Sequence, residues 1–260
     1  MTVPETRPPS RHTIPLVLLG GILAVSTASI FIRFAQGEGV PSLVIAAARL
    51  TLASLVLAPY TLTRHRAELR GLSRRDLVLA ILSGLFLAFH FAAWITSLQY
   101  TTVASSVVLV TTTPLWVAIL SPLVLKEKVS RNTQVGMILA LVGGIVVGVS
   151  DSCANLGGNF SCIFSPGLFT GKAFLGDLLS LVGAWMATGY MLAGRKLRVK
   201  MTLIPYITLV YSTSAVILIF MMAVMRISPI GFPPFLMKCR RVLRDWISLS
   251  TMLPRVTTAL

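Results

Sequence analysis

Residues 98–148 read LQYTTVASSVVLVTTTPLWVAILSPLVLKEKVSRNTQVGMILALVGGIVVG. This stretch carries two apolar segments, 103–125 and 133–149, which are joined by the short charged loop KEKVSR. About 20 mostly apolar residues are enough to cross a bilayer as a helix. The stretch therefore predicts two membrane-spanning helices in succession.

The whole chain has the composition of a membrane protein. Its 260 residues are 55% hydrophobic and only 12% charged, with a mean hydropathy of +0.84. Backbone groups in lipid must be paired within their own segment, so the spans are predicted to be helices. We predict an all-α, multi-pass transmembrane helical bundle with seven spans: 14–35, 40–62, 77–100, 103–125, 133–149, 174–193 and 203–225. The first span is too long for a signal peptide.

The net charge of +15 is concentrated in alternate loops, which argues against a nucleic-acid partner. Loops on the cytoplasmic side of a membrane are enriched in Lys and Arg. Fourteen basic residues fall on one side (Arg7, Arg11, Arg64, Arg66, Arg70, Arg74, Arg75, Lys126, Lys128, Arg131, Arg195, Lys196, Arg198 and Lys200), against Arg33, Lys172 and Arg226 on the other. We predict a multi-pass protein of the inner membrane, with a cytoplasmic N-terminus and the loop 150–172 outside.

Two of the three cysteines, Cys153 and Cys162, lie in that outer loop. Compartments outside the cytoplasm permit disulfides. We predict that these two residues can pair, with two free thiols as the alternative.

The first four spans place their most polar residues at one depth. Counted inward from the outer end at 1.5 Å per residue, these side chains lie roughly 13–16 Å deep. They are Ser26, Thr27, Arg49, His90, Thr111, Thr112 and Thr113. Polar residues at that depth normally face the bundle interior or a water-filled cavity. The pattern predicts a polar cavity near the bilayer midplane.

Arg49 has no carboxylate partner at its depth. None of the eight acidic residues (Glu5, Glu38, Glu68, Asp76, Glu127, Asp151, Asp177 and Asp245) falls in the middle of a span. The guanidinium must therefore use carbonyls, hydroxyls, water or an anionic group of a substrate. A substrate-binding role and a structural role are both open.

His90 and Trp94 are four residues apart and share one helix face. His90 either is a buried histidine bonded to a neighbour or lines the cavity, where it would be the one deep titrating side chain. Trp94 either lines the cavity or fills space.

Two features of the opening stretch concern helix shape. Pro114 follows three threonines and removes a backbone hydrogen bond, which predicts a kink with or without ligand contact. Small residues recur every four positions at Gly136, Ala140, Gly144 and Gly148. Such a face lets helices approach closely, either as an internal seam or as a homodimer contact.

Signatures of an enzyme are missing from the sequence. It contains no zinc-type Cys and His spacing, no phosphate-binding glycine loop and no paired carboxylates. Serine and histidine side chains have no acidic partner at the same depth. We predict a protein that is not an enzyme, with no metal and no cofactor.

The same residues resemble a known family. The elements Ala104-Ser105, Pro114-Leu115, Leu125-Lys126-Glu127, Gln134, Gly136 and Gly143-Gly144, with Pro41 and Arg49-Leu50 before them, are similar to EamA-type permeases of the drug/metabolite transporter superfamily. The resemblance covers about residues 14–230. It implies ten helices in two inverted five-helix repeats. It also implies transport of small polar or amphipathic metabolites, directed outward.

Set against that resemblance, the chain divides into five segments. These are a disordered cytoplasmic tail (1–13), a first five-helix repeat (14–149), the outer loop (150–172), a partial second repeat of two helices (173–230) and an atypical basic tail (231–260). The apolar pattern fails after Arg226, so the chain resembles a permease truncated after the seventh helix, with a frameshift as one origin. The alternatives to a transporter are an inactive remnant and a seven-helix receptor or sensor.

Overall fold

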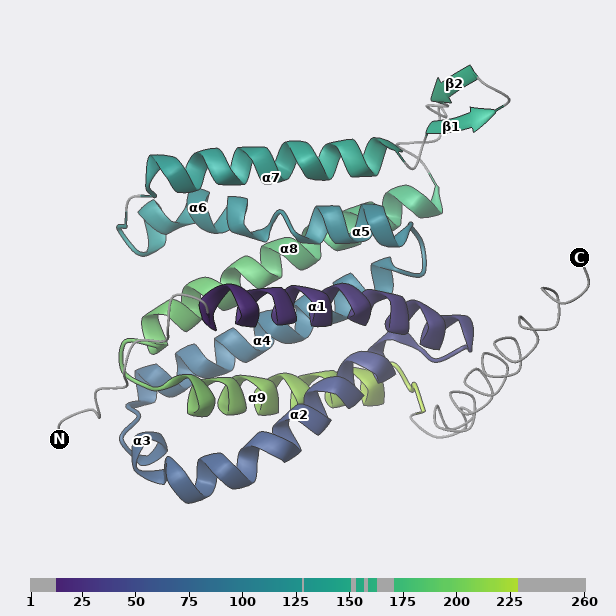
Figure 1. The fold of residues 1–260 in the computed structure, drawn as a ribbon. Coiled ribbons are helices and arrows are strands. Elements are labelled where there is room, and N and C mark those ends of the chain that lie inside the picture. Colours follow the sequence, from purple (N-terminus) through teal and green to yellow (C-terminus); the bar gives the residue numbers. More distant parts are fainter. Residues whose placement is uncertain (1–12, 128, 151–152, 157–158, 163–170, 229–260) are drawn as a thin grey trace, which may run out of the picture.

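The structure is a computed structural model, which describes residues 13–127, 129–150, 153–156, 159–162 and 171–228. Two predicted tails lie outside the described residues: the N-terminal tail 1–13, except for Thr13, and the C-terminal tail 231–260. Most of the loop 150–172 also lies outside them. The elements are α1 (Thr13–Gly37), α2 (Ser42–Arg64), α3 (Arg66–Arg70), α4 (Arg74–Ser97), α5 (Val103–Val110), α6 (Thr113–Val124), α7 (Arg131–Ser150), β1 (Cys153–Leu156), β2 (Asn159–Cys162), α8 (Lys172–Leu197) and α9 (Leu203–Val224) (Figure 1).

The prediction of a helical membrane bundle is confirmed in its main lines. Within the described residues, six segments are long and apolar enough to cross a membrane. They are Leu19–Gly37, Ser42–Arg64, Arg74–Ser97, Val103–Val124, Lys172–Leu197 and Leu203–Val224. These match six of the seven predicted spans. The remaining one, 133–149, is helical as α7 but does not belong to the six.

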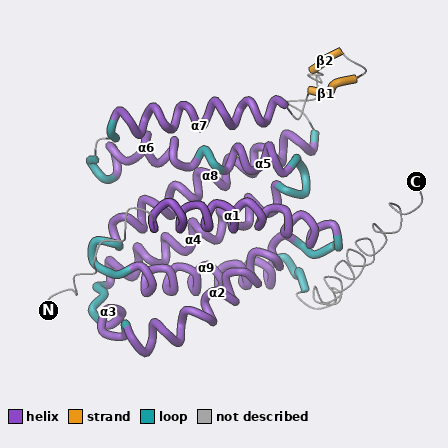
Figure 2. The backbone as a smooth tube through the Cα atoms, viewed as in Figure 1, coloured by secondary structure: helices purple, strands orange, loops and turns teal. Residues whose placement is uncertain are grey.

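A short β-hairpin departs from the all-α prediction. Strands β1 and β2 pair antiparallel between α7 and α8, and the register places Cys153 opposite Cys162 (Figure 2). Opposed Cα atoms in an antiparallel pair are about 4.5–5.5 Å apart, within the range a disulfide spans. The backbone register is therefore compatible with the disulfide, which stays a prediction.

The core lies where α4 packs on α8 and α9, and α2 packs on α9. Small side chains make these close contacts possible, since Ala80, Gly84, Ala88 and Ala92 form a buried stripe along α4. A Cβ built on Gly84 would lie 2.6 Å from Cβ of Thr213 in α9. The close approach of α4 and α9 at this point thus depends on the absence of a side chain.

Helix α7 lies at the edge of the bundle. It contacts α5 and, to a smaller extent, α6. The predicted small-residue seam is internal only in part: a Cβ on Gly144 would lie 3.1 Å from Val108 of α5, whereas one on Gly136 would have no atom within 4 Å. Its use as a homodimer face stays a prediction.

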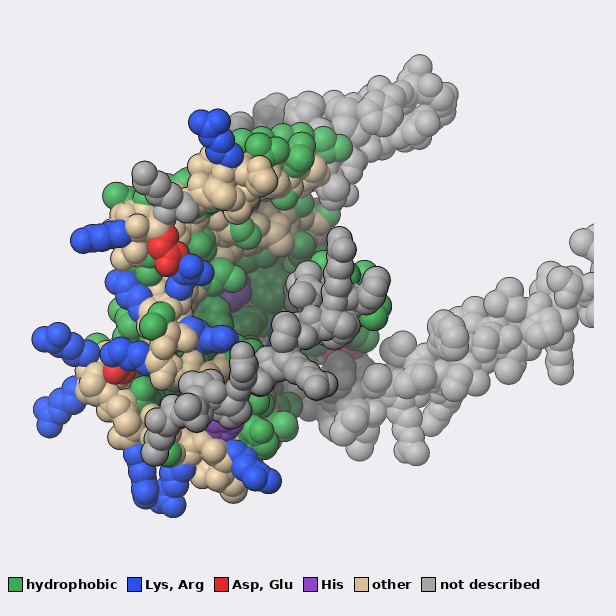
Figure 3. Space-filling view, turned by 60° about the vertical axis from the view of Figure 1, so that its left-hand side comes forward, with side chains coloured by type: hydrophobic (Ala, Val, Ile, Leu, Met, Phe, Trp, Pro, Cys, Tyr) green, Lys and Arg blue, Asp and Glu red, His purple; other side chains and the backbone are tan. Residues whose placement is uncertain are grey.

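One end of the bundle carries most of the described basic side chains. The turns around α3, between α6 and α7, and between α8 and α9 all lie at this end (Figure 1). Figure 3 shows the Lys and Arg side chains gathered over it. We call it the basic end. The opposite end holds the tight α1–α2 turn, where Gly39 adopts a φ of 83°, and the start of α8.

Candidate functional site

Three aromatic rings on one face of α4 form the centre of the candidate site. The ring centroids of His90 and Trp94 are 5.9 Å apart and nearly parallel, and Phe91 meets the His90 ring edge-on at 4.9 Å. The four-residue spacing of His90 and Trp94 produces this stacking, because such residues are neighbours on a helix surface. Gly183 of α8 lies against Trp94, so the two helices are close at this level.

The hydrogen bond of His90 fixes the orientation of its ring. Nδ1 lies 2.8 Å from the carbonyl oxygen of Gly183. A carbonyl can only accept, so Nδ1 carries the proton and Nε2 of the neutral ring is left as an acceptor.

Arg49 of α2 joins this cluster through Phe91. Its Cζ lies 5.3 Å from the centroid of the Phe91 ring, within the range of a cation–π attraction. Among the described residues, the Arg49 guanidinium has no hydrogen bond and no ion pair. The side chain is exposed at the protein surface. Its positive charge is therefore available to a further group.

A groove between α1 and α2 opens beside Arg49. Its volume is about 460 Å³, and Arg49 is its one charged lining residue. The other lining residues are apolar: Ala28, Phe31, Ile32, Ala35, Val40, Val44, Ile45, Ala48 and Leu52. The groove thus combines a cation with an apolar wall.

The Trp94 indole N–H is buried and has no hydrogen-bond partner among the described residues. Leaving a buried donor unpaired costs about 1–3 kcal/mol, so such groups usually meet water or a ligand. Arg49, Phe91, His90 and Trp94 therefore form one connected set, which we call the Arg49 cluster, with two unpaired polar groups.

Thr111, Thr112 and Thr113 lie apart from the Arg49 cluster. The span is interrupted at Thr111 and Thr112, and the helix resumes as α6 at Thr113, directly before Pro114. Each threonine hydroxyl donates to a backbone carbonyl three residues earlier, at 2.9, 2.6 and 2.7 Å. Together with Pro114, the first two line a cavity of about 110 Å³ against α7. The threonines stabilise the interrupted backbone.

Ser26 and Thr27 are also outside the cluster. Both are exposed on α1, and the Thr27 hydroxyl donates to the carbonyls of Leu23 and Ala24 in its own helix. In the described part of the chain, the seven polar residues of the predicted layer therefore do not share one cavity.

Asp177 belongs to a polar cluster that the sequence analysis missed. Thr101 and Ser105 each donate to its Oδ1 at 2.7 Å. The expectation that no serine has an acidic partner at its depth is wrong for Ser105. The sequence signal was an acid in the first turns of an apolar span, but its partners are far away in the chain: Thr101 lies in the α4–α5 turn and Ser105 in the first turn of α5.

A group of three buried serines continues this cluster inward. The hydroxyl oxygen of Ser180 lies 2.8 and 3.0 Å from those of Ser97 and Ser106, which are 2.7 Å apart, so the three hydroxyls form one hydrogen-bonded group. These side chains come from α8, α4 and α5, so the network ties three helices together at the end opposite the basic end.

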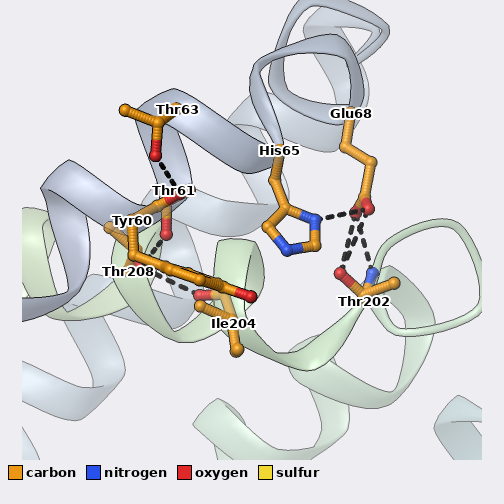
Figure 4. Close-up of polar contacts among 8 residues, drawn as sticks. All are labelled: Tyr60, Thr61, Thr63, His65, Glu68, Thr202, Ile204 and Thr208. Carbon is orange, nitrogen blue, oxygen red and sulfur yellow. Dashed lines mark hydrogen bonds and ion pairs between the residues drawn. The ribbon is translucent and has the colours of Figure 1, made fainter.

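A second set of polar contacts ties helices at the basic end (Figure 4). The hydroxyls of Thr61 and Thr208 lie 2.7 Å apart, between α2 and α9. The Glu68 carboxylate accepts from the backbone N–H of Thr202 at 3.0 Å and lies 3.0 Å from Nδ1 of His65. Burial raises the pKa of Glu68, but the hydrogen bonds from Thr202 and His65 outweigh it and lower the pKa below its usual value.

Comparison with known proteins adds an independent result. Residues 13–149 match the model of the EamA-like transporter family. The chain is 26% identical over 132 residues to the "Uncharacterized transporter YetK" of Bacillus subtilis (strain 168). That alignment covers 50% of this chain and 40% of the length of that protein. No solved structure matches the chain.

Proposed function

The chain belongs to the EamA-like transporter family, and on this premise we propose that it exports small polar or amphipathic metabolites across the cytoplasmic membrane. Alternating access is the proposed mechanism. The outward direction comes from the family resemblance. The substrate class is supported by the family and by the Arg49 cluster.

The observation that carries the proposal is the unpaired guanidinium of Arg49 over Phe91, at the edge of an apolar groove. Ionisable side chains within membrane spans are costly, and they commonly mark substrate or ion pathways. A guanidinium is well suited to carboxylate and phosphate groups because it offers several donors in one plane. The groove would receive the apolar part of the same molecule. We therefore propose an amphipathic solute with an acidic group.

The other members of the Arg49 cluster supply directional contacts in this proposal. The Trp94 N–H would donate to the solute, and Nε2 of His90 would accept from it, since Nδ1 is engaged by Gly183. Stacked rings give such a site a rigid wall. The pathway would run along α2 and α4, with α1 as its movable side.

We also propose that the basic end lies in the cytoplasm and that α8 and α9 open a second, inverted repeat. Two features support this. Lys and Arg gather at that end (Figure 3), as in cytoplasmic loops. In addition, α1 begins at the basic end whereas α8 begins at the opposite end (Figure 1). Labelling of a single cysteine placed at Arg70 in intact cells tests this orientation, and labelling by a membrane-impermeant reagent from outside would contradict it.

Transport is tested in inverted membrane vesicles that contain the full chain, with a panel of labelled amino acids, nucleosides and small carboxylic acids. Uptake into these vesicles corresponds to export. Arg49→Ala and His90→Ala are expected to lower the rate at least about tenfold, the size of one lost charged hydrogen bond. Trp94→Phe, which removes only the N–H, should reduce it less.

The matched control is Arg64→Ala, because Arg64 is an exposed arginine on the same helix α2 outside the cluster. Its transport should equal that of the unchanged chain. Transport that all three cluster variants leave unaltered would overturn the site assignment, and an absence of transport by the unchanged chain would overturn the proposed function.

A further inference from the structure

The end of α6 and the end of α8 form a pocket at the basic end that the Arg49 cluster does not use. Its volume is about 470 Å³, and the lining includes Lys126, Arg195, Lys196 and Arg198. An adjoining hollow of about 500 Å³ shares Arg195 and Arg198 and extends along α8. We call these two hollows together the basic pocket.

Positive charge in the basic pocket is in excess. Its one acidic lining residue, Glu127, forms an ion pair with Arg195 at 2.7 Å. Lys126, Lys196 and Arg198 have no ion pair within the described part of the chain. Guanidinium and ammonium groups that converge on one hollow are a typical arrangement for binding phosphate.

Apolar side chains flank these cations. Val124 and Val199 line the same hollow and are 42% and 85% exposed, while Met191 and Leu203 line the adjoining one and are each 47% exposed. A free phosphate would use only the cations. A phospholipid would use both, with its headgroup on the cations and its acyl chains along the apolar flank.

We propose that the basic pocket binds the phosphate headgroup of an anionic phospholipid from the leaflet at the basic end. Basic pockets between transmembrane helices bind such headgroups because the charge attraction adds to burial of the acyl chains. The bound lipid would bridge the α6–α7 loop and the end of α8. The proposal does not depend on which solute the chain transports.

The test measures binding of dioleoyl-phosphatidylglycerol to the full chain in a neutral detergent, through the rise in thermal midpoint with lipid concentration. Arg195→Gln/Arg198→Gln should weaken binding at least about tenfold, given the attraction per cation near a membrane surface. The control, Arg64→Gln/Arg66→Gln, removes the same charge at the same end outside the pocket. It should bind like the unchanged chain.

Other arms distinguish the source of the ligand and guard against misfolding. Dioleoyl-phosphatidylcholine should not stabilise the chain. Inorganic phosphate at about a tenfold excess over the lipid, which corresponds to about 1.4 kcal/mol of binding free energy, should not displace the lipid. Lys126→Gln/Lys196→Gln leaves the Arg195 ion pair in place and should also weaken binding. Equal weakening in the control, equal stabilisation by phosphatidylcholine, or displacement by inorganic phosphate would each overturn the proposal.

Discussion

Helices α7 and α8 are both rich in glycine, yet they use it differently. In α8, a Cβ on Gly176 would lie 2.8 Å from the backbone nitrogen of Thr101, and one on Gly189 would lie 2.9 Å from the Phe86 ring. In α7, neither Gly136 nor Gly143 has an atom within 4 Å of that position. Small residues therefore permit close packing in α8 and leave an open face on α7.

A regular glycine pattern is therefore not sufficient to identify a packing seam. The regular four-residue spacing is on α7, which lies at the edge, whereas the crowded glycines of α8 follow no such spacing. What distinguishes α8 is its neighbours, because α4, α5 and α6 all pack on it.

The largest expected effect is on glycine substitution in the two helices. Gly176→Ala should destabilise the fold by about 1–3 kcal/mol, as overpacking does, because the backbone of Thr101 cannot move aside. Gly143→Ala should be neutral or stabilising by up to about 1 kcal/mol, since alanine favours helix. Thermal midpoints in detergent measure both. Equal effects of the two changes would remove the contrast between the helices.

The next effect concerns the Asp177 carboxylate, which connects α8 to the α4–α5 turn and to the start of α5. Asp177→Ala should cost about 1–2 kcal/mol, because two hydroxyl donors, Thr101 and Ser105, lose a charged acceptor. On α7, the Thr133 hydroxyl has Ser130 as its one hydrogen-bond partner within the described part of the chain, so Thr133→Ala should cost less than about 0.5 kcal/mol. Thermal unfolding of both variants checks this. Asp177→Asn, which keeps an acceptor, should fall between them, and a loss as large as that of Asp177→Ala would contradict the hydrogen-bond account.

The smallest effect is on the loops that precede α9 and α7. Glu68→Gln should lower stability by about 1 kcal/mol at pH 7, comparable to losing a helix cap at Thr202. Because the pKa of Glu68 is lowered in the folded chain, its contribution is complete above its ordinary pKa of about 4.3 and disappears as the pH falls below it. The difference in thermal midpoint between the variant and the unchanged chain should therefore shrink between pH 6 and pH 3.5, roughly spanning that value.

The control for this pH dependence is Glu127→Gln, on the α6–α7 loop. Its ion pair with Arg195 is 48% and 64% exposed, and such pairs contribute about 0–1 kcal/mol. We expect almost no change in midpoint at either pH. A pH response of Glu127→Gln as large as that of Glu68→Gln would mean that bulk charge, and not the Thr202 contact, is responsible.

The sequence predicted the helices well because bilayer-length apolar segments leave few alternatives. Six of the seven segments recur as candidate spans, and the interruption before Pro114 lies in the expected stretch. Arg49 and His90 were predicted from their common depth, and Trp94 from its four-residue spacing to His90; in the structure His90 stacks on Trp94, and Arg49 joins them through Phe91. These features depend on local composition, which a single sequence contains.

Side-chain direction and long-range pairing were not predictable in the same way. Thr111 and Thr27 bond to their own helices, because a hydroxyl within lipid can be satisfied by a carbonyl one turn back. Asp177 looked isolated, since its partners are about one-third of the chain away, as non-local contacts commonly are. Depth along a helix gives no information on the face that a residue occupies.

The hydroxyl pairs described above have a consequence for biogenesis. Thr61 with Thr208 and Ser97 with Ser180 each join a helix made early to one made late in translation. Until α8 and α9 leave the ribosome, these early hydroxyls have no such partner. The segment up to α7 is thus expected to wait in the membrane as loosely associated helices, and the arrival of α8 and α9 would complete the bundle.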